Sequence, residues 1–474
     1  MSNEKTVWMR VYAPGGVISP HDLRVIAGTS NTLGYGMLRA GLRQDILVPN
    51  IPAMEERRFC SLISPMKACI YSAENPPNIT SSYAAAELGN TTPWADSDTY
   101  QNIIKSFDFQ PWLRVNVADP RQNLFPVGGG DINFIASKTE DVWHVVLHLP
   151  YMNEAQRLPA GIEGERLAEF VRDVERIVLG EDEPTAAAIL ESIRQKWKKG
   201  LVVLDEDPEA APPAYGSYGG FHAMPKGGGQ WLGTGARDAL FDFYFVDEIC
   251  RMAVELGVAT LGISPWNALL VKNIRDGAVA NWKTLLSRHG IAEQRGHAEL
   301  WFTSETDGAD ARARKSFSEQ TGALCAAAPG LSFTLGDFSR AETAVLIRRI
   351  AKPAGVFWRK ESFTIFAREK LDRRSAQLNL FAEKIPAAEV PARLAELTEK
   401  FRAEQIARTQ AVVEAAKKEN GGPHYQCPDC LTRYDRKYGD PENGVVAGTP
   451  FADVPPMWQC PLCETAKNRF AEVA

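Results

Sequence analysis

The chain has 474 residues, of which 45% are hydrophobic and 24% charged, which is the balance of a globular protein with several domains. Lys and Arg number 53 against 59 Asp and Glu, giving a net charge of −6 without long runs of one sign, which argues against nucleic-acid binding. No apolar stretch approaches the roughly 18 residues of a membrane helix, and the N-terminus lacks the layout of a secretory signal. The eight cysteines do not form a disulfide framework. We therefore expect a cytoplasmic protein with no membrane span.

Two segments of the chain repeat one pattern. Residues 33–51 align without a gap to residues 256–274, and each follows a helix-like stretch and runs through a glycine into an apolar strand-like segment. Identical pairs include Leu33 and Leu256, Gly34 and Gly257, Leu38 and Leu261, Val48 and Val271, Asn50 and Asn273, and Ile51 and Ile274. Coincidence between two common helix–turn–strand units is the alternative, but the shared register favours an internal duplication.

The rest of the chain divides around these copies. Strand-like segments are expected at 111–119, 131–137 and 143–149, and helices at 164–180 and 184–198. An Ala-rich helix is expected at 390–419, with Val390, Leu394, Leu397 and Phe401 on one stripe. The predicted domains are a first half at 1–205, a Pro- and Gly-rich linker at 206–229, a second half at 230–388, a helical spacer at 389–422, and a small domain at 423–474.

Two C-x-x-C pairs lie near the C-terminus, at Cys427 and Cys430 and at Cys460 and Cys463. A tight C-x-x-C turn points two sulfurs at one centre, so two such turns predict a tetrahedral S4 metal site. Zinc is the simpler alternative, but zinc ribbons usually separate their pairs by roughly 15–20 residues, and here residues 431–459 intervene.

The surrounding residues 424–474 resemble the rubredoxin family. The shared features are the D-P-x-x-G turn (Asp440, Pro441, Gly444), the G-T-x-F-x-D-x-P segment (Gly448, Thr449, Phe451, Asp453, Pro455), and Trp458 before the second pair. Tyr425, Tyr434, Phe451, Trp458 and Phe470 are expected to form an aromatic core. The resemblance implies one iron, Fe²⁺ or Fe³⁺, bound by the four cysteines and carrying one electron at a time.

The sequence departs from rubredoxins at one repeated position. Rubredoxins usually have glycine directly after the second cysteine of each pair, whereas this chain has Leu431 and Glu464. If these backbones are left-handed, each residue costs on the order of 1–2 kcal/mol. Metal binding offsets this cost, at roughly 10–16 kcal/mol for structural tetrahedral sites.

Roughly residues 8–385 resemble the sirohaem sulfite and nitrite reductases. The first copy has that family's helix, its G-x-x-x-L-R strand from Gly34, and its R-Q pair at Arg43 and Gln44 before an apolar strand. ISPWNALLVKNI in the second copy is similar to the family's T-P-x-Q-N segment, and PWLRVNVADPRQNLFPVGGGDINFIAS to its basic strand and D-I-G-F turn. The resemblance implies an α+β fold with a pseudo-twofold pair of ferredoxin-like half-domains.

The same resemblance implies a cationic cleft between the halves. Arg43 and Arg114 match positions that bind tetrapyrrole carboxylates or an anionic substrate, and Arg121 lies nearby without a firm match. Trp266 stands opposite Arg43 in the repeat alignment. A salt bridge from Arg43 to Asp45 or a nearby Glu is the structural alternative, because a buried guanidinium needs a counter-charge.

The family's cluster ligands are missing. It needs four cysteines after the second half-domain to hold a 4Fe–4S cluster and link it to sirohaem. Only Cys325 lies between Cys250 and Cys427, and Ser332 and Phe333 stand where a second cysteine would fall. Without thiolates the cluster cannot assemble, so we expect neither the 4Fe–4S cluster nor sirohaem.

Three functions remain open from the sequence. In the first, the rubredoxin domain delivers electrons to, or accepts them from, a redox partner protein docked on the body or a cofactor held by it. The resemblance suggests nitrate, nitrite or sulfur assimilation as the setting. In the second, the body reduces a small oxyanion with a retained tetrapyrrole or flavin. In the third, it is a cofactor-free assembly or scaffold subunit.

Overall fold

The computed structural model describes residues 6–41, 43–66, 70–71, 78–89, 91–122, 124–197, 199–204, 206–208, 219–225, 227–235, 240–265, 268–291, 301–303, 324, 327–328, 331–335, 343–354, 358–371, 377–419, 424–436, 438–446 and 449–473. It divides into two compact units, Met1–Thr398 and Glu399–Ala474. The division falls within helix α9 (Val390–Glu419). In the described part of the chain, no helix is long and apolar enough to cross a membrane.

The two predicted copies have the same order of elements. The first runs β1 (Thr6–Tyr12), β2 (Val17–Ile18), α1 (Pro20–Leu33), β3 (Met37–Ala40), β4 (Asp45–Pro52) and α2 (Glu56–Ile63). The second runs β13 (Gln230–Gly235), β14 (Phe241–Asp242), α6 (Phe243–Glu255), β15 (Leu261–Ser264), β16 (Ala268–Ile274) and α7 (Val279–Arg288). Both long helices begin at a polar cap, because Ser19 accepts from the N–H of Asp22 and Asp242 from the N–H of Phe245.

Each copy also has a bulge at the same residue. Asn50 has φ 59° and Asn273 has φ 58°, a left-handed conformation that Asn tolerates better than most residues. Each lies where the pairing with the neighbouring strand shifts register, β4 against β1 and β16 against β13. The duplication predicted from the sequence is therefore present in the backbone geometry.

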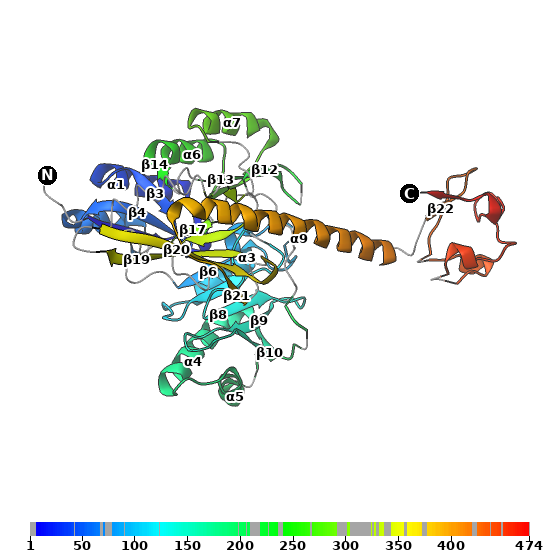
Figure 1. The fold of residues 1–474 in the computed structure, drawn as a ribbon, viewed down its shortest axis with the longest axis horizontal. Coiled ribbons are helices and arrows are strands. Elements are labelled where there is room, and N and C mark those ends of the chain that lie inside the picture. Colours follow the sequence, from blue (N-terminus) through cyan, green and yellow to red (C-terminus); the bar gives the residue numbers. More distant parts are fainter. Residues whose placement is uncertain are drawn as a thin grey trace. The chain divides into compact units, whose positions relative to one another are not determined.

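The copies are joined by a reciprocal exchange of short strands. β14 pairs with β3 through Phe241 and Leu38, and β2 pairs with β15 through Ile18 and Leu261. Helices α1 and α6 pack against each other (Figure 1), and residues of both copies form one hydrophobic core. Such interlocking requires both copies to fold together.

The second pair of sheets repeats as well. One has the order β11-β10-β9-β8-β7-β6 and the other β17-β18-β19-β20-β21; in each, the first three strands along the chain are parallel and the following ones antiparallel. The first comprises β6 (Ile79–Ser81), β7 (Val115–Ala118), β8 (Ile132–Ala136), β9 (Val142–Leu147), β10 (Gln156–Glu163) and β11 (Leu201–Val202), and the second β17 (Trp301–Thr303), β18 (Phe333–Leu335), β19 (Val345–Ala354), β20 (Trp358–Arg368) and β21 (Leu378–Ile385).

In each of these sheets, the last long strand along the chain is followed by a helix. α4 (Leu167–Gly180) and α5 (Ala186–Lys196) lie within the predicted helical segments. The first turns of α9 follow β21 as α4 follows β10, and Val390, Leu394 and Leu397 of the predicted stripe are buried. These turns of the predicted spacer thus correspond to a helix of the first half. The predicted linker contains a strand, β12 (Gly220–Ala223), which pairs with β13.

Lys272 connects strand β16 to the first half of the chain. Its Nζ donates to the carbonyl of Ala86 at 2.9 Å and of Tyr83 at 3.4 Å. Burial lowers the pKa of Lys272 to about 8. The unfolded chain, with a lysine pKa near 10.4, then binds more protons than the folded chain between these two values.

Stability should therefore rise with pH across this window. The charged form of Lys272 costs stability below pH about 8, and deprotonation relieves the cost as pH approaches 10.4, by up to about 3 kcal/mol. Lys272→Met is expected to remove this contribution to the rise of the free energy of unfolding with pH. Urea unfolding at pH 7.5 and at pH 10.5 measures the rise. Lys105→Met, at an exposed helix position, is the control; an equal rise in the wild type and Lys272→Met would contradict the prediction.

Candidate functional site

Two tight loops of the second unit carry the four cysteines. In the first, the N–H of Leu431 donates to the carbonyl of Cys427 at 3.0 Å, and the N–H of Cys427 to the carbonyl of Thr432 at 2.8 Å. The second loop forms the same two bonds around Cys460, at 2.9 and 2.8 Å. These bonds close each loop and turn both of its sulfurs to one side.

The loops bring the four sulfurs together. All four lie within 4.8 Å of one another, and the closest pairs are Cys427 with Cys463 and Cys430 with Cys460, both at 3.5 Å. A tetrahedral site with metal–sulfur bonds of about 2.3 Å requires sulfur–sulfur distances of about 3.8 Å, so this cage fits a single ion. Cys427 and Cys460 are buried, whereas Cys430 is half-buried and Cys463 exposed.

Backbone N–H groups favour the thiolate form of Cys427. Burial raises the pKa of the Cys427 thiol, but the N–H groups of Cys430 and Asp429 donate to its sulfur and lower the pKa to about 6. Thiolate is the form that binds a metal. The neighbouring sulfurs of Cys430 and Cys427 raise the pKa of Cys463 to about 11, so a cation is needed to hold all four sulfurs as thiolates.

The predicted aromatic core supports the site. Tyr425 stacks on Phe451 with ring centroids 4.1 Å apart, and Phe451 also contacts Tyr434, Trp458 and Phe470. A three-stranded sheet of β22 (His424–Gln426), β23 (Arg433–Tyr434) and β24 (Ala471–Val473) closes the domain.

Leu431 and Glu464 adopt the left-handed conformation expected for glycine at these positions, with φ 62° and 58°. Each therefore carries a strain that glycine would avoid. Leu431→Gly and Glu464→Gly are each expected to stabilise the domain by about 1 kcal/mol, seen as slower iron loss to a chelator. Leu462→Gly, at an exposed position of the same loop without positive φ, is the control; no gain over it would count against strain at these residues.

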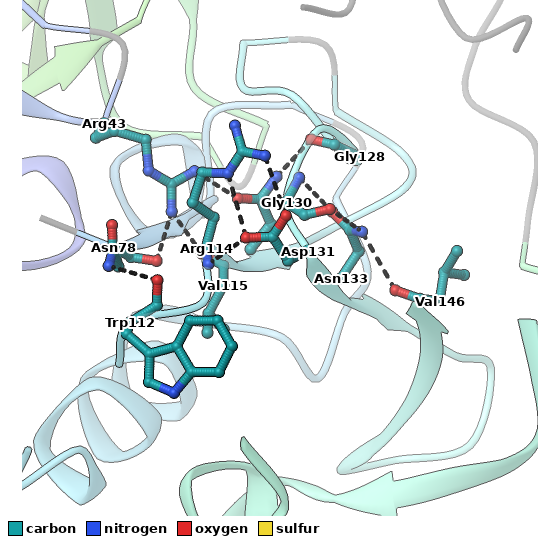
Figure 2. A network of polar contacts seen from close by, with 11 residues as sticks. Arg43, Asn78, Trp112, Arg114, Val115, Gly128, Gly130, Asp131, Asn133 and Val146 are labelled. Atoms are coloured by element: carbon teal, nitrogen blue, oxygen red, sulfur yellow. Dashed lines mark hydrogen bonds and ion pairs between the residues drawn. The ribbon is translucent and has the colours of Figure 1, made fainter. Parts of the chain in front are cut away.

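Arg43 and Arg114 lie in one network of polar contacts in the first half (Figure 2). Arg43 donates to the side-chain oxygen of Asn116 at 2.8 Å and to the carbonyls of Asn78 and Val115 at 2.5 and 3.0 Å. Burial, and to a smaller extent the nearby charge of Arg114, lower the pKa of Arg43 to about 10. The predicted partner Asp45 forms a buried salt bridge with Arg10 at 2.5 Å.

Arg114 is held by Asp131. Its backbone N–H donates to one carboxylate oxygen at 2.8 Å, and its guanidinium contacts both oxygens at 3.3 and 3.0 Å. The Arg114 side chain remains 39% exposed. Arg121 lies in the turn after β7, where its N–H donates to Asp119. The structure thus brings two of the three predicted arginines into one network.

Of the other predicted positions in the body, the structure describes two and leaves two outside the described residues. Trp266 and Cys325 lie outside the described residues. Ser332 is buried and accepts from the N–H of Ala344 at 2.9 Å, and Phe333 is fully buried at the start of β18. Both residues thus pack into the second half-domain at the position that the resemblance assigns to the cluster's second cysteine.

Sequence reasoning missed Thr432 and Thr465, whose hydroxyls lie 3.1 and 3.0 Å from the sulfurs of Cys430 and Cys463. The signal was present, because both loops read C-P-x-C-x-T.

Comparisons with known proteins agree with this geometry. The rubredoxin family model matches residues 424–470. Rubredoxin 4 of Rhodococcus sp. (strain Q15) is 46% identical over 46 residues, which are 10% of this chain and 77% of that protein. The high molecular weight rubredoxin of Moorella thermoacetica is 49% identical over 51 residues, 11% of this chain and 22% of that protein. The anaerobic nitric oxide reductase flavorubredoxin of Escherichia coli O9:H4 is 40% identical over 60 residues, 13% of this chain and 12% of that protein.

Through its C-terminal domain the chain belongs to the rubredoxin family, and its four cysteines are arranged to bind one iron. The chain spans only a small part of the length of the Moorella and Escherichia proteins. Among solved structures, the Mycobacterium tuberculosis NirA protein matches with a TM-score of 0.63 at 12% identity, covering 81% of this chain and 79% of that chain. This match shows the fold alone, and it confirms the α+β fold that was predicted for the body.

Proposed function

We propose that this chain is a one-electron transfer protein. Its rubredoxin domain delivers electrons to, or accepts them from, a partner oxidoreductase docked on the reductase-like body or a cofactor held by that body. The cage of four sulfurs within 4.8 Å carries the proposal. An iron ion bound there supplies the Fe³⁺/Fe²⁺ couple, and the two exposed or half-buried cysteines place sulfur at the surface for electron exchange.

The covalent link between the units supports this role. A tether raises the effective concentration of one domain at a site on the other, into the millimolar range for a short flexible linker. The proposed setting is nitrate, nitrite or sulfur assimilation, which rests on the body's fold. The proposed location is the cytoplasm, where thiols stay reduced and available to iron.

The reactivity of the reduced chain tests this proposal. The iron-loaded chain is reduced with dithionite, freed of excess reductant, and mixed with nitrite or sulfite while the visible iron–thiolate absorption is followed. An electron-transfer protein should stay reduced until an electron-accepting protein is added. Rapid reoxidation by either oxyanion alone would contradict the proposal and favour an oxyanion reductase.

The second candidate, an oxyanion reductase with a retained tetrapyrrole or flavin, is favoured by the arginine network. Two guanidinium groups gather there, and the charge of Arg114 adds to the effect of burial in lowering the pKa of Arg43. A small anion or a cofactor carboxylate would relieve the repulsion between these charges. Calorimetric titration of wild type and Arg114→Gln with sulfite and nitrite tests it. Arg114 is the residue to change, because Arg43 supports the loop with three hydrogen bonds.

A further inference from the structure

The two cysteine loops of the iron site have the same sequence pattern. Each loop reads C-P-x-C-x-T, and each threonine places its hydroxyl beside the second sulfur of its loop, Thr432 at 3.1 Å from Cys430 and Thr465 at 3.0 Å from Cys463. As a protonated thiol, Cys430 donates to the Thr432 hydroxyl. A metal-bound thiolate carries no proton, so a hydrogen bond between such a pair then requires the hydroxyl to donate.

The surroundings of the two hydroxyls differ. Thr465 donates to a carboxylate oxygen of Asp429 at 2.7 Å. Asp429 is itself held by Arg469 through two bonds of 2.8 and 2.9 Å. In the described part of the chain, the hydroxyl of Thr432 has the Cys430 sulfur as its hydrogen-bond partner.

This difference matters because a hydroxyl has one hydrogen. The proton of Thr465 points at Asp429, a stronger acceptor than sulfur, and its oxygen lone pairs are left toward Cys463. The proton of Thr432 is available to Cys430. The two sulfurs are therefore inequivalent in spite of the repeated sequence.

We propose that Thr432 raises the reduction potential of the site by donating a hydrogen bond to Cys430, and that Asp429 is a positioning residue that withholds the Thr465 hydroxyl from Cys463. Reduction adds one electron and thus one negative charge to the metal and its four thiolates. A hydrogen bond to sulfur stabilises the more negative, reduced form and raises the potential. Arg469 keeps the Asp429 carboxylate in place for this purpose.

The first experiment compares the two threonines in the full-length, iron-loaded chain by redox titration of the visible absorption. Thr432→Val is expected to lower the one-electron reduction constant about tenfold, a shift of about 59 mV to lower potential. Thr432→Ser keeps the hydroxyl and should restore the wild-type value. Thr465→Val should change the constant less than about threefold, since no hydrogen bond to sulfur is lost. Equal shifts for Thr432→Val and Thr465→Val would overturn the proposal.

The second experiment isolates the role of Asp429 by a double-mutant cycle. Asp429→Ala removes a negative charge near the site, which raises the potential whether or not the hydroxyl is present. It also frees the Thr465 hydroxyl to donate to Cys463, and this part requires Thr465. Asp429→Ala should therefore raise the reduction potential more in the wild-type background than in the Thr465→Val background. The same rise in both backgrounds would show that Asp429 acts by charge alone.

This inference rests on the proposed electron-transfer role of the site. A wild-type chain that binds no redox-active iron would defeat the proposed function and the inference together. A wild-type chain with redox-active iron whose variants show equal shifts would defeat the inference alone.

Discussion

Cys427→Ser is expected to abolish tight iron binding while residues 1–398 remain folded. Cys427 is buried, two backbone N–H groups donate to its sulfur, and a serine hydroxyl is a much weaker ligand for iron than a thiolate. Structural tetrahedral sites contribute roughly 10–16 kcal/mol of binding free energy, so losing one of four ligands should weaken binding by more than about 100-fold. Metal analysis and the visible spectrum measure the loss.

The matched control is Cys60→Ser. Cys60 is a half-buried thiol of the body and lies on helix α2, outside the iron site. Cys60→Ser should keep its iron, and circular dichroism should show the body unchanged in both variants. Full iron retention in Cys427→Ser would contradict the four-ligand assignment.

Asp45→Ala is expected to lower the free energy of unfolding of the body by about 3–5 kcal/mol. Asp45 begins β4, directly after the R-Q pair, and its carboxylate lies 2.5 Å from the Arg10 guanidinium with both side chains at 4% exposure or less. The substitution takes the carboxylate away from a guanidinium that stays buried, which is costly. Urea unfolding followed by tryptophan fluorescence gives the change.

Two comparisons sharpen this test. Arg10→Met combined with Asp45→Ala should recover much of the loss, because no buried charge then remains at the pair. Asp247→Ala removes ion pairs with Arg24 and Arg251, whose side chains are 52% and 56% exposed, and it should cost only about 1 kcal/mol. The iron absorption should persist in Asp45→Ala. A cost as small as that of Asp247→Ala would show that burial does not govern this pair.

The iron site could be predicted almost completely from the sequence, because each loop is made by residues adjacent in the chain. The C-x-x-C turns, the aromatic core and the strained backbones of Leu431 and Glu464 are all local features. The inequivalence of Thr432 and Thr465 was not predictable, since Asp429 reaches Thr465 across 36 residues of sequence.

The body shows the opposite balance. The duplication was predictable because residues 33–51 and 256–274 align without a gap; one matching pair, Asn50 and Asn273, marks the same bulge in both copies. The strand exchange was not, since β2 and β14 have two residues each and so carry no periodicity. The partners of Arg43 likewise lie far away in the chain, Asn78 at 35 residues and Asn116 at 73. Tertiary packing therefore decided which groups surround this arginine.

The most direct test of electron transfer through the four-cysteine site is a stoichiometric reductive titration of the purified full-length chain, combined with metal analysis. We expect one iron per chain, bound by Cys427, Cys430, Cys460 and Cys463, and the bleaching of its visible absorption by one electron per iron. A chain that, after expression with ample iron, holds zinc in these cysteines and takes up no electron would contradict the account.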